Sequence, residues 1–191
     1  MNNHVELAFK EWTGLLGPDR AKSDQATIRS YARTTLPGTA APMGVLYPAS
    51  TTEVQEIVRI ARQNQVSIYP ISRGRNWGYG DACPVREGQV IMDLSRMNKI
   101  LEINQDLAYA VIESGVTQEQ LSRHLESNHP ELMFDCTGSG PEASIAGNTL
   151  ERGFGHTPYG DHFLYSCGME VVLGDGRVLN TGFGHSKNAQ A

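Results

Sequence analysis

The sequence has little cysteine, no excess of positive charge and no long hydrophobic run. Its three cysteines in 191 residues are an odd number, and their wide spacing fits neither a disulfide framework nor a CxxC zinc site. A reducing, cytoplasmic location is therefore the simpler expectation. The net charge of −5 disfavours general binding to nucleic acid or an anionic membrane. No apolar run approaches the roughly 20 residues that cross a bilayer.

The first 20 residues show no basic segment followed by an apolar one, so no signal peptide is predicted. A processed protein would look the same. Residues 4–17 could form a short amphipathic helix that ends at Gly14 or Gly17. Residues 45–50 resemble a strand that stops at Pro48. Residues 50–65 form the clearest helix pattern, with Ser50 or Thr51 as the cap.

A buried strand is predicted over residues 66–72, which completes a strand–helix–strand unit. Strands follow at 89–94, 99–104 and 108–114, the last two joined by a turn at 104–106. Residues 115–127 predict a second helix, in which Thr117 and Gln120 can form a capping box. A short helix is expected at 144–152, and a β-hairpin at 169–182 turning at 174–176.

The stretch "PISRGRNWGYG", residues 70–80, holds three glycines among anion-binding side chains. Because glycine has no Cβ, successive main-chain N–H groups can converge on one point there and bind a phosphate. Ser72 and Asn76 could add hydrogen bonds, and two arginines could add charge. The spacing matches neither GxGxxG nor the GxxxxGK[ST] phosphate loop. The composition is equally compatible with a plain tight loop.

This loop and its surroundings resemble the vanillyl-alcohol oxidase and p-cresol methylhydroxylase family of FAD-dependent flavoproteins. The resemblance covers about residues 45–185 and is carried by the loop and by "YPASTTEVQEIVRIA", "VIMDLSRMNKILEIN", "AYAVIESGVTQEQL", "TGSGPEASIAGNTLERGFGHTPYGDHF" and "CGMEVVLGDGRVLNTG". It is closest to the branch that oxidises 4-alkylphenols. It implies an α+β fold: a PCMH-type FAD-binding domain of two α/β subdomains that is C-terminally incomplete.

The resemblance also assigns roles within the loop. It places six residues along the FAD diphosphate: Ser72, Arg73, Gly74, Arg75, Asn76 and Gly78. Tyr79 matches the family's tyrosine that hydrogen-bonds a phenolic oxygen of the substrate, which makes it the candidate catalytic residue. The alternative for Tyr79 is a loop aromatic packed on a strand.

The second glycine-rich segment follows the same resemblance. Beside the isoalloxazine and ribityl chain it places Gly138, Ser139, Gly140, Ser144, Gly147 and Asn148; toward the adenine half it places Gly153, Gly155, Tyr159, Gly160 and Glu170. The oxidase branch has an aspartate near the reactive flavin nitrogen. Here Ser139 takes the equivalent place, which favours the dehydrogenase-like branch.

Two further features have ordinary structural explanations. Glu151 and Arg152 suggest a solvated ion pair rather than catalytic groups. His156, Asp161 and His162 are close in sequence, but no third ligand with zinc spacing accompanies them. We expect turn hydrogen bonds from them and no metal site.

The predicted organisation is an N-terminal extension (1–40), a first subdomain with a mixed sheet and the loop (41–107), and an incomplete second subdomain (108–191), in which a second mixed sheet begins near Ala108. In the parent enzyme, benzylic hydride transfer to FAD would oxidise a phenolic small molecule, and water would add to the quinone methide. A cytochrome or a second chain is a possible partner; nucleic acid and membrane are not. The alternatives are a stand-alone FAD-binding or partner module and a flavin-less structural relative.

Overall fold

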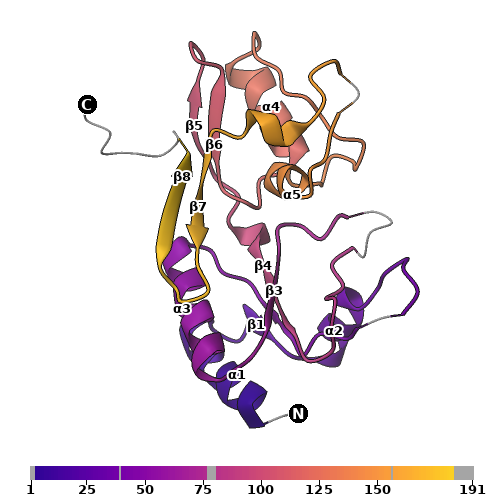
Figure 1. Ribbon diagram of the computed structural model, residues 1–191, viewed down its shortest axis with the longest axis vertical. Helices are drawn as coiled ribbons and strands as arrows, with labels where there is room; N and C mark the ends of the chain where they lie inside the picture. The colour runs from indigo at the N-terminus through magenta and orange to yellow at the C-terminus, as the bar shows by residue number, and fades with distance from the viewer. Residues whose placement is uncertain (1–2, 39, 77–80, 156, 183–191) are drawn as a thin grey trace.

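The computed structural model describes residues 3–38, 40–76, 81–155 and 157–182. Figure 1 shows two lobes joined end to end. The first contains a four-stranded sheet with α1 and α3 beside it, and the second contains β5, β6, α4 and α5. The β7–β8 hairpin runs along one side, from the second lobe down to α3. No helix of the described ranges is both long and apolar enough to cross a membrane.

The sheet of the first lobe is mixed, as predicted. Its order is β1 (Ala21–Lys22), β2 (Val45–Leu46), β4 (Val90–Asp93) and β3 (Ile68–Ile71). β1 is antiparallel to β2, whereas β2, β4 and β3 are mutually parallel. The carboxyl ends of the three parallel strands therefore meet at one edge of the sheet, the edge at which ligands commonly bind in such sheets.

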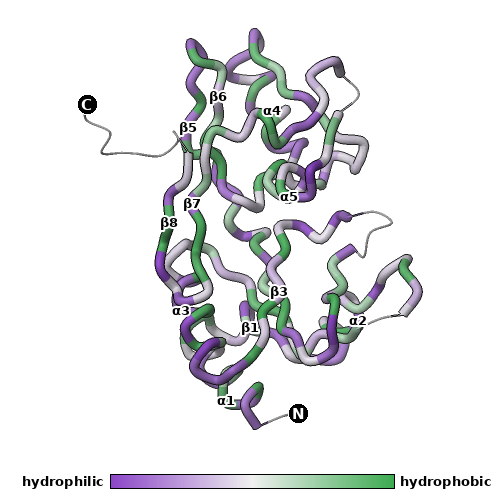
Figure 2. Tube along the Cα trace, viewed as in Figure 1, coloured by the Kyte–Doolittle hydropathy of each residue, from purple (hydrophilic) through white to green (hydrophobic). Residues whose placement is uncertain are grey.

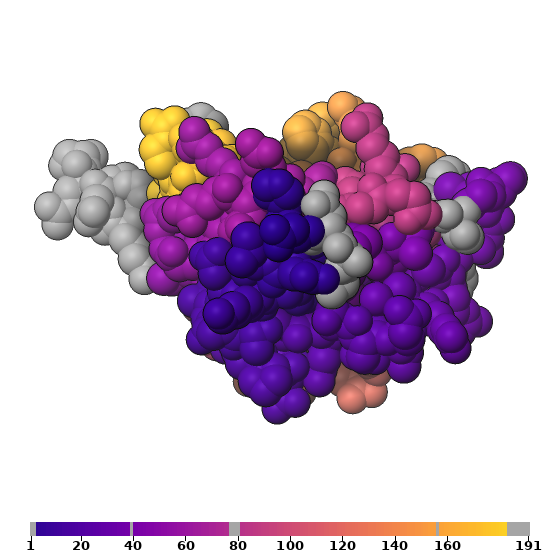
Figure 3. All heavy atoms as spheres, turned by 90° about the horizontal axis from the view of Figure 1, so that it is seen from below, coloured from indigo at the N-terminus to yellow at the C-terminus, as the bar shows by residue number. Residues whose placement is uncertain are grey.

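Two amphipathic helices form the main core with this sheet. α1 (Asn3–Leu16) ends one residue before Gly17, which has a φ of +82°, so the predicted stop at Gly17 is confirmed. In α3 (Thr51–Gln63), Ser50 is the N-cap and accepts a hydrogen bond from Glu53 N–H. Trp12 of α1 is fully buried, and its Nε1 donates to Ile57 O of α3 at 3.3 Å. Atoms of the N-terminal part cover most of the face seen from below (Figure 3).

The strand predicted at 66–72 forms as β3, but the prediction that it is buried is wrong. β3 pairs only with β4 among the described strands and lies at the edge of the sheet, with its residues half-buried and Pro70 exposed. Proline lacks the N–H that a central strand would need, so an edge position suits this sequence. The neighbouring strand β4 is buried instead, with all four of its residues shielded from solvent.

A helix that the sequence reading did not predict, α2 (Gln25–Tyr31), follows β1 and is capped by Asp24. Tyr31 at its end donates a hydrogen bond to Asp93 Oδ2 at 2.6 Å, and Tyr47 Oη donates to Tyr31 Oη at 3.0 Å. Burial, reinforced by the hydrogen bond to Asp93, raises the pKa of Tyr31 well above its ordinary value. These phenols attach α2 to the carboxyl end of β4.

The second lobe does not contain the expected second mixed sheet. The described residues form two separate two-stranded sheets there, β5 (Ile100–Asn104) with β6 (Tyr109–Ile112) and β7 (Gly168–Val172) with β8 (Val178–Gly182), and both are antiparallel. Each pair is joined by a short turn, which suits antiparallel but not parallel pairing. A small core under α4 (Gln118–Asn128) holds the lobe together.

The β7–β8 hairpin packs on α3 rather than within the second core. Thr51 Oγ1 donates to Glu170 Oε1 at 2.6 Å, and Gln55 Nε2 donates to Gly176 O at 2.7 Å. Val172 packs against the core of the first lobe. Figure 2 shows hydrophobic residues along β7 where it runs toward α3. The chain therefore returns to its first lobe after building the second.

The structure bears on the predicted domain limits at two points. The limit between residues 107 and 108 falls in the turn between β5 and β6, which are hydrogen-bonded to each other. Residues 1–40, predicted as an extension, include α1, which contributes five residues to the main core, and β1, which extends the sheet. The three-part division stays a prediction.

Candidate functional site

The glycine loop begins where β3 ends, at the carboxyl edge of the parallel strands. Ser72 follows the last strand residue, and the turn closes with a hydrogen bond from Asp81 N–H to Asn76 O at 3.2 Å. Among the described residues, none accepts a hydrogen bond from the main-chain N–H groups of residues 72 to 76. Within the described part of the chain, these five successive N–H groups have no acceptor, which is the pattern expected of an anion-binding loop.

Gly74 is required by the loop's own geometry. Its φ is +62°, and a Cβ at this position would lie 2.6 Å from Ala82 Cβ. A side chain would therefore be strained by the backbone and would collide with Ala82. The glycine shapes the loop before any ligand is considered.

The loop lies against the second glycine-rich segment. A Cβ placed on Gly147 would be 3.5 Å from Ser72 Cβ and Oγ, so Ser72 borders the first turn of α5 (Ile145–Leu150). The Arg75 guanidinium pairs with the Glu142 carboxylate. Arg73 is half-buried and forms no ion pair with any described residue. The fold therefore brings together two segments about 70 residues apart in sequence and leaves one cation beside the loop uncommitted.

The stretch around Gly138, Ser139 and Gly140 is held by Gln118, the first residue of α4. Gln118 is buried; its Nε2 donates to Gly140 O at 2.9 Å, and its Oε1 accepts from Thr137 N–H at 2.8 Å. Gln118 N–H also donates to Ala143 O. Ser139 Oγ lies 3.3 Å from Thr137 Oγ1. Gln118 therefore ties this stretch to the start of α4 at three points.

α5 lies within the short helix expected at 144–152 and is capped by Ser144, whose Oγ accepts from Gly147 N–H at 3.1 Å. Its Asn148 is part of a network that sequence reading did not find. His162 Nδ1 lies 2.5 Å from Asn148 Oδ1, and His162 Nε2 lies 3.2 Å from Asp135 Oδ2. Thr157 Oγ1 donates to the same carboxylate oxygen at 2.8 Å. The side chains of Asp135 and His162 are each only 13% exposed.

Gly153 and Gly155 make room for that network. A Cβ on Gly153 would overlap the Asn148 side chain, and one on Gly155 would overlap the Asp135 carboxylate. Close packing within the protein therefore accounts for two of the glycines that sequence reading assigned to the cofactor. Gly160 lies beside them in the same turn, and its carbonyl accepts from Gly155 N–H.

Of the cluster His156, Asp161 and His162, Asp161 forms the expected turn hydrogen bond, whereas His162 contacts residues distant in sequence. Asp161 pairs with Arg152 at 2.9 Å and caps the 3-10 helix η2 (His162–Tyr165) by accepting from Phe163 N–H. That N–H, followed by the Arg152 guanidinium, holds the pKa of Asp161 below its ordinary value. Across the described segments, no three His, Cys, Asp or Glu side chains are grouped to hold a metal ion. His156 lies outside the described residues.

The remaining candidates divide between the outer surface and the undescribed residues. Tyr159 is exposed, with its ring 6.3 Å from that of Tyr165. Glu170 is exposed on β7 and hydrogen-bonded to Thr51 of α3. Gly78 and the candidate catalytic residue Tyr79 lie outside the described residues.

The site therefore has two opposed parts, the loop 72–76 and the segment 137–148, each fixed by protein contacts. The residues that sequence reading missed are Gln118, Asp135 and the inward role of His162. The only sequence signal for Gln118 is its position directly after the Thr117 cap, in the first turn of α4. That position does not by itself indicate contacts with residues 137–143. Asp135 and His162 are 27 residues apart, and no local pattern links them.

Comparison with known proteins places this arrangement among flavoproteins. The family described as "FAD binding domain" matches residues 42–182. The 4-cresol dehydrogenase [hydroxylating] flavoprotein subunit of Pseudomonas putida is 39% identical over 180 residues, which are 93% of this chain and 34% of that protein. The 1'-carboxy-chondrochloren decarboxylase of Chondromyces crocatus is 39% identical over 186 residues, 97% of this chain and 34% of that protein.

Solved structures agree on the fold. p-Cresol methylhydroxylase with substrate bound superposes with a TM-score of 0.95 at 36% identity, over 100% of this chain and 38% of that one. 4-Ethylphenol oxidase from Gulosibacter chungangensis, in an isoeugenol complex, gives a TM-score of 0.92 at 39% identity, over 100% of this chain and 37% of that one. The chain thus has the PCMH-type α+β fold and spans about a third of the length of these relatives.

Proposed function

Because the chain belongs to the FAD-binding-domain family, whose cofactor is FAD, we propose that it holds the FAD diphosphate on the main-chain N–H groups of residues 72–76. The single observation that carries this proposal is the run of five donors without an acceptor among the described residues. A diphosphate is bound by several main-chain donors. We propose that this run provides them from a loop, and not from the N-terminus of a long helix.

The residues present fit this cofactor. Gly74 keeps the loop in a conformation with φ of +62°, and Ser72 borders the first turn of α5. Arg73 supplies an uncommitted positive charge, whereas Arg75 is already paired with Glu142. Gln118 and the Ser144 cap fix the segment that the resemblance places beside the isoalloxazine. We therefore assign the diphosphate to the loop and the ring system to the stretch 137–148.

For the activity of the whole enzyme we propose oxidation of a 4-alkylphenol, in which bound FAD supplies the acceptor for a hydride from the benzylic carbon. Relatives named for 4-cresol and 4-ethylphenol support this substrate class. Tyr79 is proposed to hydrogen-bond the phenolic oxygen, and Ser139 to stand where the oxidase branch has an aspartate. The role of this chain's residues is to bind and orient the cofactor and the phenol.

The reaction is not determined by this third of the enzyme alone. A decarboxylase and a dehydrogenase subunit are both 39% identical to the chain. The name "flavoprotein subunit" supports a second chain as partner in that relative, and a cytochrome or a second chain is our proposal for this one. The cytoplasmic location inferred from the cysteines stays a prediction.

Titration of the purified chain with FAD tests the cofactor site, with visible absorbance and flavin fluorescence giving Kd. We expect binding and a higher melting temperature with FAD. Arg73→Ala should raise Kd about tenfold, because a charge-assisted contact is lost. Arg75→Ala should raise it by about threefold or less, because that cation is paired with Glu142. Arg123→Ala, on the surface of α4, is the matched control.

A colourless chain whose melting temperature does not change when FAD is added would instead support the hypothesis that the protein is a structural relative without flavin. Equal losses for Arg73→Ala and Arg75→Ala would contradict the assignment of the uncommitted charge. FAD binding without turnover of 4-alkylphenols is expected of a fragment of the enzyme; activity restored by a complementary polypeptide would indicate a stand-alone module.

A further inference from the structure

The segment 150–165 exposes large apolar side chains to solvent while it directs some polar side chains into the protein. Two of its polar side chains turn inward: His162 and Thr157 contact the carboxylate of Asp135, and His162 also lies against Asn148. Its large apolar side chains turn outward, each between 41% and 72% exposed: Leu150, Phe154, Tyr159, Phe163, Leu164 and Tyr165. We call these six side chains the 150–165 face.

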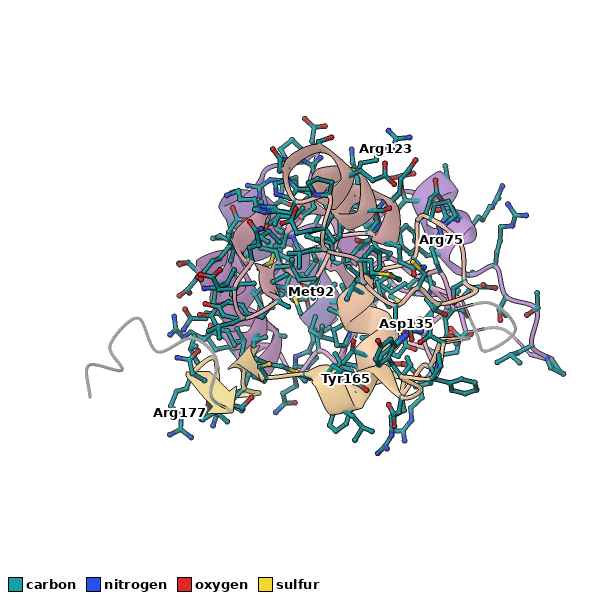
Figure 4. All side chains as sticks on the ribbon, turned by 90° about the horizontal axis from the view of Figure 1, so that it is seen from above. Arg75, Met92, Arg123, Asp135, Tyr165 and Arg177 are labelled. Atoms are coloured by element: carbon teal, nitrogen blue, oxygen red, sulfur yellow. The ribbon has the colours of Figure 1, made fainter. Side chains whose placement is uncertain are left out.

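The backbone beneath this face is firmly held. His162 N–H donates to Gly153 O at 3.1 Å, Gly155 N–H donates to Gly160 O at 3.3 Å, and Arg152 pairs with Asp161 at 2.9 Å. In Figure 4, Tyr165 lies at the outer edge of the molecule and Asp135 lies further in. The exposed aromatic rings are therefore displayed on a fixed scaffold.

The members of the face lie close together. The Tyr159 and Tyr165 rings are 6.3 Å apart in an edge-to-face arrangement, and the Arg152 guanidinium lies 5.2 Å from the centre of the Phe163 ring. The backbone at Phe154 bridges to that at Asp161. An exposed apolar group of this kind on a monomer marks an interaction surface, and tyrosine, phenylalanine and arginine are enriched at such surfaces.

We propose that the 150–165 face is the docking surface for a polypeptide lobe equivalent to the two thirds of the relatives that this chain does not match. Two facts select this occupant. The matched relatives are covered over only 34–38% of their length, so most of the chain of each relative lies outside the matched part. The charges at the face, Arg152 and Asp161, already neutralise each other, which suits a permanent apolar contact rather than a charged ligand.

A chimera tests the proposal. This chain replaces the matching third of the Pseudomonas putida flavoprotein subunit, so that the remaining two thirds are present in their native connection. Thermal unfolding is compared for Phe154→Ser with Leu164→Ser, in the chimera and in the isolated chain. The matched control is Val85→Ser with Leu107→Ser, two other positions that are more than 70% exposed.

If the lobe covers the face, the Phe154→Ser and Leu164→Ser pair lowers the melting temperature of the chimera by about 5 °C or more and leaves that of the isolated chain unchanged. The control pair moves neither. Equal shifts in chimera and isolated chain, or none in either, overturn the proposal, as does a chimera that fails to fold while the natural subunit folds.

Light scattering on the isolated chain provides the second arm. A dimer that the Phe154→Ser and Leu164→Ser pair converts to monomer would make a second copy the occupant and overturn the proposal; a monomer in both cases agrees with it. Neither arm depends on FAD. The FAD titration can fail while docking succeeds, so the failure of one proposal is distinguishable from the failure of the other.

Discussion

The side chains of Asp135 and His162 meet across 27 residues of sequence, with Oδ2 and Nε2 3.2 Å apart and both groups 13% exposed. This contact joins the residues just before Gly138 to the 3-10 helix η2, which follows α5. Because Thr157 donates to the same carboxylate and Asn148 contacts the other ring nitrogen of the imidazole, the four groups hold the turn 150–165 in place.

Asp135→Ala is expected to lower the free energy of unfolding by about 1–3 kcal/mol, because it strands the buried imidazole and hydroxyl donors. Urea unfolding followed by circular dichroism measures this change. Asp106→Ala, in the exposed turn between β5 and β6, is the control and should have no measurable effect. Equal stability of the two variants would show that the network does not hold the turn.

Gly74→Ala is expected to destabilise the protein even without a cofactor. Gly17 offers a matched control, because its φ of +82° is also positive but a Cβ there would meet nothing within 4 Å. Gly17→Ala should cost about 1–2 kcal/mol from backbone strain alone. Gly74→Ala should cost more, because its Cβ would also press on Ala82. The difference in melting temperature between the two variants measures the effect of the contact with Ala82. Identical losses of stability would mean that Ala82 moves away at no cost.

The tyrosine pair on Asp93 predicts a loss of stability at alkaline pH. The folded pKa of Tyr31 lies above its unfolded value of roughly 10, so its contribution is complete below that pH and is lost as the pH rises further. Burial also raises the pKa values of Tyr47 and Tyr69, which add to the same loss.

Tyr31→Phe should therefore be less stable at pH 7, by about 1 kcal/mol for the lost hydrogen bond, and should lose less stability above pH 10 than the natural chain does. Denaturant unfolding at several pH values measures both effects. Tyr165→Phe, at an exposed position, serves as the control. Parallel stability curves for the natural chain and Tyr31→Phe would rule out Tyr31 as a source of the alkaline loss.

Local patterns were sufficient for most elements of this fold. Caps at Ser50 and Thr117 mark the starts of α3 and α4, and each accepts the expected main-chain N–H. The capping box at Thr117 forms in one direction, since the Gln120 side chain donates to Asn98 O instead of returning to the cap. Tertiary contact overrode the local preference there.

What the sequence could not predict was how its segments are placed in space. The hairpin at 168–182 was expected, but its attachment to α3 through Glu170 and Gly176 was not. β3 was read as buried from its apolar residues, although its edge position follows from its pairing. The site divides in the same way: the loop was found from its glycines, while Gln118 and Asp135 act through distant partners that no local spacing encodes.

The attachment of the hairpin to α3 also constrains how the protein folds. Thr51 and Glu170 are separated by 119 residues, and Val172 contributes to a core built mainly by the first 92 residues. During synthesis on a ribosome, β7 can complete that core only after the second lobe has been made. Contacts this distant in sequence slow folding, so a nascent chain arrested before residue 168 would leave one flank of α3 bare and open to chaperones.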